Sequence, residues 1–308
     1  NGDVTFQAAV KNFGTQQRVR HEFQFFVDNQ LVHRGLIDID AGEQTTATVS
    51  HRFEIPGEHV VEARLADDSL LVDNRRWLSV PVRESIRVLC VAGKPGAARH
   101  LAFALEPRLS GRRRVYPQII PESALLEHDL PNYDCVFLCN VSRFGPQEAD
   151  ILREYVNKGG GVVVFLGDQV TPDSYNRELG GQALGQRLLP AQIGEIISEP
   201  QYGFNPLDYQ HEIAKPFQGN EQAGLLTTPV WRYFRLQPVE STRIRVALAF
   251  GNGDPVILDE VVGGGRILLV ATAASTASMD RSSDPPVRWT AFSIWPSFAP
   301  VVQEMLSL

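Results

Sequence analysis

The first part of the chain alternates between hydrophobic and polar positions in short runs. The run from Val4 to Val10 has hydrophobic residues at every second position, which is the period of a half-buried β-strand. Similar short runs follow, separated by turn residues such as Asp28-Asn29 and Pro56-Gly57. Short strands at this spacing, with few helical patterns between them, indicate a sandwich. We predict an all-β, immunoglobulin-like β-sandwich over residues 1–83.

The pattern changes at residue 86, where the hydrophobic positions become continuous. Residues 86–93 and 162–167 are apolar nearly throughout, which is typical of strands buried on both faces of a parallel sheet. Stretches with a helical period lie between such strands, and Pro95 and Pro146 open two of them, because proline is tolerated at the first helical position. This alternation predicts a parallel α/β domain with right-handed connections over residues 86–308.

Residues 168–228 interrupt the alternation of strands and helices. We interpret them as a long insertion with little regular structure, and long loops of this kind are often functional or mobile. After it, the turn Gly251-Asn252-Gly253-Asp254 predicts a β-hairpin. Apolar positions at helical spacing over residues 298–306 predict a C-terminal helix.

Composition narrows the classes of function. A length of 308 residues suits two domains, and a net charge of −7 argues against a nucleic-acid-binding protein. The three cysteines form no CxxC pattern, so we expect no structural zinc site. No apolar run has the roughly 20 residues that span a bilayer. Because the chain starts without methionine, in the middle of a strand-like pattern, we expect it to be a piece of a longer protein.

The candidate chemistry lies at the carboxyl edge of the predicted sheet, where open α/β sheets bind ligands. Four residues end or follow predicted strands there, and they are our candidate ligand-binding residues: Gly93, Cys139, Asn140 and Asp168. Cys139 suits a nucleophile assisted by His211 or His100. We favour a small buried apolar residue, since no base is tied to it by spacing. Asp168 suits a ligand contact or the cap of the next segment, and we favour the cap.

Three other clusters contain residue types that occur in binding sites, but none matches the motif of such a site. Asp208, His211 and Glu212 resemble no strong metal template, and we expect them to be solvated. The acids at positions 38, 40 and 43 fit an exposed strand face better than a calcium site. The stretch Gly93-Lys94-Pro95-Gly96 lacks the frame of a phosphate-binding loop. We therefore predict no metal and no cofactor.

Residues 134–166 carry a resemblance to a known family. A strand is followed by Asn140-Val141-Ser142, a Pro-x-Glu helix, the run Tyr-Val-x-x-Gly159-Gly160-Gly161 and another strand. This order resembles the flavodoxin-like class I glutamine amidotransferase-like fold, especially its trehalose-utilisation-type branch. The hairpin region 256–272 looks like the late hairpin of that fold. Residues 10–14 and 57–61, as Val-x-Asn-x-Gly and Gly-x-x-x-Val, resemble the bacterial cell-adhesion-related domain (CARDB).

The order of the two domains resembles the periplasmic region of bacterial membrane proteins that carry a von Willebrand factor A domain. In those proteins a final Pro-Ser-Phe-x-Pro-x-Val-Gln-Glu-x-Leu helix leads into a transmembrane segment, and residues 296–306 match it. The resemblance implies a periplasmic location, with membrane attachment through segments outside this chain. It also implies a partner in another protein or in other domains of the parent chain.

The catalytic motifs of the amidotransferase-like family are missing. Its fourth strand ends in Gly-x-Cys-x-Gly, where a helix N-terminus lowers the pKa of the thiol. The aligned position here is Phe165, and the late His-x-Glu pair is absent. We therefore favour a non-catalytic interaction region. The alternatives are a divergent hydrolase or sugar-related enzyme that uses the carboxyl edge, and a small-molecule binding domain without chemistry.

Overall fold

The chain divides into two structural units, Asn1–Glu84 and Ser85–Leu308. The computed structural model describes residues 4–66, 73–82, 85–106, 115–181 and 187–308. The division falls between the two predicted domain ranges. Each unit has its own apolar core, and each is described by itself.

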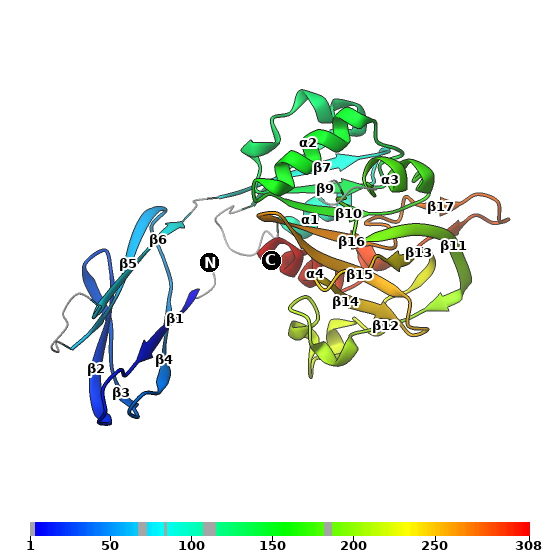
Figure 1. Cartoon of the computed structure of the whole chain (residues 1–308). Helices are drawn as coiled ribbons and strands as arrows, with labels where there is room; N and C mark the ends of the chain where they lie inside the picture. The colour runs from blue at the N-terminus through cyan, green and yellow to red at the C-terminus, as the bar shows by residue number, and fades with distance from the viewer. Residues whose placement is uncertain (1–3, 67–72, 83–84, 107–114, 182–186) are drawn as a thin grey trace. The chain divides into compact units, whose positions relative to one another are not determined.

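The first unit is a β-sandwich (Figure 1). Its strands are β1 (Val4–Lys11), β2 (Arg18–Val27), β3 (Gln30–Ile39), β4 (Gln44–His51), β5 (Gly57–Leu65) and β6 (Arg75–Val82). β1 pairs with β4, and the other four form a sheet in the order β3-β2-β5-β6. The predicted all-β sandwich is confirmed.

The two sheets of the first unit face each other across a small apolar core. Buried residues come from both sheets: Phe23, Phe25, Val27, Ala47, Val49, Phe53 and Val61. Along β2 and β4 they occupy every second position, because successive side chains of a strand point to opposite faces. The alternation seen in the sequence is therefore the inside–outside pattern of the sandwich.

The turn between β2 and β3 is tied to β5 by a histidine with an acceptor at each ring nitrogen. His59 Nδ1 lies 2.5 Å from Asp28 Oδ2, and Nε2 lies 2.7 Å from the backbone oxygen of Ile55. Both bonds form together only when both nitrogens carry a proton, so this geometry favours the imidazolium form. The bond to Asp28 and then the bond to Ile55 raise the pKa of His59. The Val60 backbone N–H and then His59 lower the pKa of Asp28.

We expect the first unit to lose stability as the pH rises above neutrality. Because the folded pKa of His59 is raised, its contribution is complete below about pH 6.5 and is lost as the pH rises through the folded pKa. The contribution of Asp28, whose pKa is lowered, is lost only in acid. Among the described residues, Glu58 and His51 also act electrostatically on this pair.

Thermal unfolding of the chain at about pH 5.5, 7 and 8.5 measures this effect. His59→Gln should flatten the alkaline loss of stability in the first unit. His33→Gln, at an exposed histidine of β3 in the same unit, should keep it. An alkaline limb that is unchanged in His59→Gln would show that another group titrates.

The second unit is built on an eight-stranded mixed sheet in the order β12-β14-β15-β16-β10-β9-β7-β8 (Figure 1). Its strands are β7 (Ile86–Ala92), β8 (Val115–Pro121), β9 (Cys135–Cys139), β10 (Gly161–Phe165), β12 (Phe204–Asn205), β14 (Ile244–Phe250), β15 (Pro255–Val262) and β16 (Gly265–Val270). Two further pairs are β11 (Ala191–Tyr202) with β13 (Val230–Pro238), and β17 (Met279–Asp280) with β18 (Val287–Arg288).

The α-helices of this unit are α1 (Arg99–Leu105), α2 (Pro146–Asn157), α3 (Pro172–Glu178) and α4 (Phe298–Ser307). Short 3₁₀ helices connect other elements: η2 (Glu122–Glu127), η3 (Leu130–Asn132), η4 (Leu207–Tyr209), η5 (Lys215–Phe217), η6 (Glu221–Ala223) and η7 (Phe292–Ile294). Within the described residues, none of the helices combines the length and the apolar character that crossing a membrane requires.

The parallel part of the sheet contains a point where the direction of winding reverses. β8, β7, β9, β10 and β16 run parallel to one another, whereas β15 pairs antiparallel with β16. The chain passes from β7 to β8 in one direction across the sheet, and from β9 to β10 in the other. Right-handed connections then place α1 and α2 on opposite faces. The carboxyl ends of β7 and β9 flank this reversal, where open α/β sheets form a crevice.

The expectation of little regular structure over residues 168–228 was wrong. β11, of 12 residues, lies in this range together with α3 and β12, and it pairs with β13. The register of the pair shifts between Ile193 and Ile196 and again between Ser198 and Tyr202. Such irregularities change which residues face inward, so the strand lacks the regular alternation by which a sequence reveals it.

The helix expected to open at Pro95 begins later, at Arg99. Residues 95–98 form turns. Gly96 has a φ of +83°, a left-handed conformation that cannot belong to a right-handed helix. The start at Pro146 is confirmed, since α2 begins at that residue.

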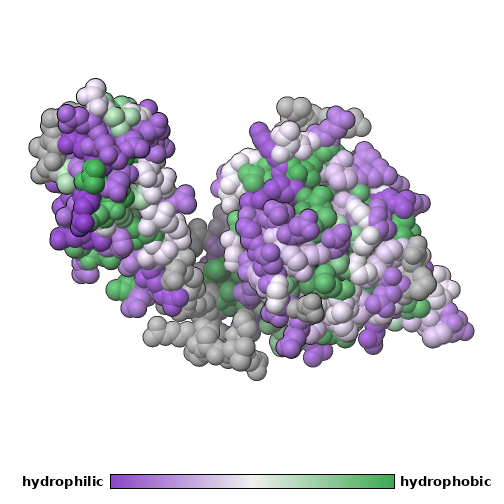
Figure 2. Space-filling model, turned by 90° about the horizontal axis from the view of Figure 1, so that it is seen from below, coloured by the Kyte–Doolittle hydropathy of each residue, from purple (hydrophilic) through white to green (hydrophobic). Residues whose placement is uncertain are grey.

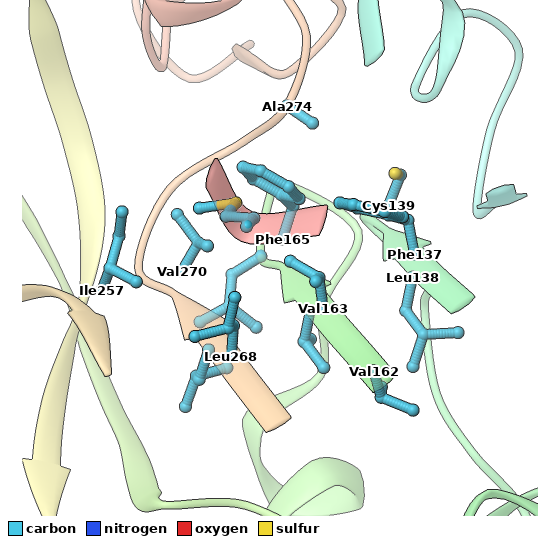
Figure 3. Packing of buried hydrophobic residues seen from close by; sticks show 14 of the residues in the cluster. Phe137, Leu138, Cys139, Val162, Val163, Phe165, Ile257, Leu268, Val270 and Ala274 are labelled. Carbon is cyan, nitrogen blue, oxygen red and sulfur yellow. The ribbon is translucent and has the colours of Figure 1, made fainter. Parts of the chain in front are cut away.

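The second unit has a core of buried strands. Val88 to Val91, Val136 to Leu138 and Val162 to Phe165 are at most 2% exposed, as expected for strands covered on both faces. Figure 3 shows part of this cluster, with Phe165 and Cys139 near Phe137. In the space-filling view of Figure 2, hydrophilic residues cover much of the visible surface, with hydrophobic ones between them.

Candidate functional site

The reversal point of the sheet brings together the four residues proposed from the sequence. Gly93 follows β7, Cys139 ends β9, Asn140 follows β9 and Asp168 lies beyond β10. The Gly93 backbone N–H donates to the Cys139 oxygen at 3.0 Å, and the Asn140 N–H donates to the oxygen of Phe165 at 2.9 Å. The loops that leave three neighbouring strands are therefore joined directly at this edge.

Asn140 is the centre of the arrangement. It is 2% exposed and has a φ of +54°, a left-handed conformation in which asparagine is one of the more tolerated residues. Its Oδ1 accepts the backbone N–H of Gln169 at 2.9 Å, and its Nδ2 donates to Asp168 Oδ1 at 2.8 Å and to Ser278 Oγ at 3.4 Å. One amide side chain thus links the loops after β9, β10 and β16.

Two glycines allow the loops to approach Asn140. A Cβ at Gly93 would lie 1.8 Å from the Asn140 backbone oxygen, and a Cβ at Gly167 would lie 2.5 Å from its Oδ1. Both distances are shorter than van der Waals contact allows, so only glycine fits at either position without movement of the backbone or the amide. Close packing of three loops is therefore the reason for glycine here.

Asp168 forms an ion pair with Lys94 that is largely shielded from water. Lys94 Nζ lies 2.7 Å from both carboxylate oxygens, and the two side chains are 13% and 15% exposed. Met279 donates its backbone N–H to Oδ2 at 3.3 Å. Burial raises the pKa of Asp168, but the bonds from Lys94, Asn140 and Met279 outweigh it, so the pKa lies below its ordinary value.

The favoured interpretation of Asp168 as a cap was wrong. The N-cap position of α3 is Thr171, and no side-chain cap bond forms there. Asp168 instead bonds to loops from other strands. The sequence also gave no role to Lys94, although a lysine and an acid that follow two strands of one sheet are a usable signal. Ser278 and Met279 follow no predicted strand, and nothing in their surroundings pointed to this edge.

No residue at this edge is placed as an activated thiol. Cys139 is 1% exposed, and burial raises the pKa of its thiol well above the ordinary value, which disfavours the thiolate that nucleophilic chemistry requires. Phe165, which we expected at the nucleophile position of an amidotransferase-like fold, is fully buried, and its ring stacks with that of Phe137 at 6.5 Å between centroids. Burial also raises the pKa of Cys90 to about 12.

His211 is buried, so the expectation of a solvated histidine was wrong. Its Nε2 donates to Asp259 Oδ2 on β15 at 3.0 Å, and its Nδ1 accepts the Ile213 backbone N–H at 3.2 Å. Because β15 is separated from β9 by β16 and β10, this histidine does not serve Cys139. Within the described ranges, no three His, Cys, Asp or Glu residues are grouped as ligands of a metal ion.

Two cavities of the second unit lie away from this edge. One of about 480 Å³ is lined by residues of α3 and the start of β11, among them Asn176 and Gln192. Another of about 320 Å³ lies at the opposite, amino-terminal edge of the sheet, between Gly161, Val261 and Leu308. The loops at the carboxyl edge meet instead: Gly96 is close to Ala277 of the loop after β16.

Comparisons with known proteins find one family match and several structural likenesses. Residues 1–74 match the CARDB family model, and the solved CARDB domain of a Pyrococcus furiosus protein is 17% identical over 27% of this chain and 81% of its own, with a TM-score of 0.25. Two cytoplasmic proteins of Salmonella typhimurium are each 15% identical over 72% of this chain and 98% of their own, with TM-scores of 0.52 and 0.54. At that level of identity, the structural likeness shows a shared fold alone. No curated protein matches the chain. The first unit contains a CARDB β-sandwich.

Proposed function

We propose that this chain is a non-catalytic interaction region of a larger, membrane-anchored bacterial protein. In this proposal the CARDB sandwich and a degenerate class I glutamine amidotransferase-like domain both serve binding. A CARDB match suggests an interaction or adhesion domain. The order of the five parallel strands, second-first-third-fourth-fifth along the chain, is the flavodoxin-like order and supports the kinship of the second unit.

The observation that carries the proposal is the use of the Asp168 carboxylate. One oxygen accepts from Lys94 and Asn140, and the other accepts from Lys94 and from the Met279 N–H. A general acid or base needs a proton-transfer path to substrate and a pKa near the working pH. This carboxylate has a lowered pKa and internal partners on both oxygens, so it serves to hold the loops together.

The location outside the cytoplasm rests on the likeness of residues 296–306 to helices that precede a transmembrane segment. Those residues include the start of α4. Protease treatment of intact spheroplasts, whose inner membrane is closed, tests this location. The parent protein is then detected to see whether this region has been cleaved. Cleavage of this region in intact spheroplasts is the expected result, and protection there would place the region inside.

Turnover assays test the absence of catalysis. The purified chain should release no product above the protein-free rate from a panel of amides, esters and glycosides. Any activity found should be measured again in Asp168→Asn and Cys139→Ala. Phe13→Ala, at an exposed aromatic residue of the first unit, is the matched control. Activity that persists in the control and disappears in either edge variant, while that variant is still folded at the assay temperature, overturns the proposal and favours a divergent hydrolase.

A further inference from the structure

The outer face of the four-stranded sheet in the first unit carries large apolar side chains. Residues that lie directly opposite each other on neighbouring strands share a face. One row across this face contains an acid between apolar residues: Leu31, Phe26, Glu62 and Trp77, on β3, β2, β5 and β6. Trp77 is 61% exposed. The outward face of a sandwich is ordinarily polar, so this row departs from the pattern that folding alone requires.

A second row beside the first is basic. It contains Arg34, Gln24, Arg64 and Arg75, on the same four strands. The side chains of Arg34 and Arg75 are 60% and 47% exposed. Tryptophan and arginine are the residues most enriched among those that dominate binding energy at protein interfaces. Their placement in adjacent rows makes this face a candidate interface.

The centre of the face is already ordered. The Arg64 guanidinium lies 4.3 Å from the centre of the Phe26 ring, and it donates from Nε and Nη2 to the two oxygens of Glu62 at 3.1 and 3.0 Å. Glu62 is 5% exposed. A side chain that is fixed before association loses little conformational entropy on binding, so the face is prepared for a partner.

The charges of the two rows favour an acidic partner. Three guanidinium groups stand beside two carboxylates: Glu22 lies 3.1 Å from Arg34, and Glu62 lies 3.0 Å from Arg64 and 4.0 Å from Arg75. Each guanidinium has five N–H donors, and the bonds to these carboxylates use only some of them. Among the described residues of these two rows, N–H donors therefore exceed carboxylate acceptors, although the whole chain has a net charge of −7.

We propose that this face binds a short, extended segment of a partner protein in which acidic and aromatic or aliphatic residues alternate. Each row crosses three interstrand spacings, about 14 Å, which is the length of roughly four extended residues. Carboxylates of the segment bond to the arginine row, while its apolar side chains pack on Leu31 and Trp77. The proposal rests on the interaction role given above and names its surface and the chemistry of its partner.

Binding of a labelled peptide to the full chain tests the proposal. The probe is a fluorescein-labelled peptide of about ten residues in which Glu and Tyr alternate, compared with one in which Gln replaces Glu. The Glu–Tyr peptide should bind, more weakly at high salt, and the Gln–Tyr peptide should bind about tenfold more weakly or not at all. Trp77→Ala and the double variant Arg34→Gln/Arg75→Gln should each weaken binding about tenfold.

Phe13→Ala is the matched control, because Phe13 is 80% exposed in the turn after β1 and lies outside both rows. It should bind as the wild type does. Equal binding by Trp77→Ala and the wild type, or by the two peptides, would overturn the proposal. So would binding of polygalacturonate without binding of the peptide, or self-association through Trp77 without binding of the peptide.

The outcomes for the two proposals are separable. Turnover that depends on Asp168 would remove the non-catalytic role and leave peptide binding by the first unit unaffected. Loss of the peptide result with no turnover would remove the proposed surface and leave the non-catalytic role in place.

Discussion

Replacement of Gly93 by alanine is expected to lower the stability of the second unit by about 3 kcal/mol or more, or to prevent its folding. The new Cβ would lie 1.8 Å from the Asn140 backbone oxygen and 2.8 Å from the Val141 Cα. Because both are backbone atoms, no side chain can move aside to make room. The loops after β7 and β9 would have to separate, and the bond from the Gly93 N–H to the Cys139 oxygen would be lost.

Urea or thermal unfolding of the full chain measures this loss in the transition of the second unit. Gly251→Ala is the control, because the nearest atom to its Cβ would be 4.0 Å away, at the Gly203 oxygen. We expect that variant to change the free energy of unfolding by less than about 1 kcal/mol. A Gly93→Ala protein that unfolds with the wild type would show that the two loops separate easily, and the close packing would then have no role in stability.

Replacement of Asp168 by alanine is expected to cost about 3–5 kcal/mol of stability in the second unit. The change leaves the Lys94 ammonium, 13% exposed, without its carboxylate. It also removes an acceptor from Asn140 and from the Met279 N–H. The double variant Lys94→Met/Asp168→Asn should recover part of the loss, since it removes the unpaired charge and keeps an acceptor oxygen.

The contribution of Asp168 should also depend on pH. Burial raises its pKa, yet the bonds from Lys94, Asn140 and Met279 hold it below the ordinary value. A carboxyl group whose pKa is lowered in the folded state contributes stability above about pH 3.9, its ordinary value. That contribution is lost as the pH falls through the folded pKa. The wild type and Asp168→Asn should therefore differ at neutral pH and converge in acid.

Chemical denaturation at neutral and acid pH checks this convergence. Asp150→Asn, at a 75% exposed position on α2, is the control and should change stability by less than about 0.5 kcal/mol. A difference between wild type and Asp168→Asn that is the same at every pH would mean that the ionised carboxylate contributes nothing beyond its shape.

The strands that could be read from the sequence are those whose environment is uniform. Residues 86–93 and 162–167 are continuously apolar, and β7 and β10 are buried there. β11 was not predicted, because its register with β13 shifts twice and the shifts disrupt the two-residue period. Gly96 shows a similar limit, since its φ of +83° delays the start of α1 to Arg99.

Part of the candidate site followed from chain order alone. Parallel strands present their carboxyl ends at one edge, so residues after β7, β9 and β10 had to lie near each other. Chain order therefore located Gly93, Asn140 and Asp168. It could not pair Asp168 with Lys94, 74 positions away, because the loop conformations decide which side chains meet.

The sequence by itself determined the two-part organisation of this protein, its sandwich, the buried parallel strands and the edge at which their loops converge, because burial imposes periodic patterns on a chain. Only the tertiary structure decided what that edge does. It surrounds Asn140 with two glycines, buries Cys139 and Phe165, and satisfies Asp168 with Lys94, Asn140 and Met279. These contacts depend on distances between residues far apart in the chain, which no local pattern encodes.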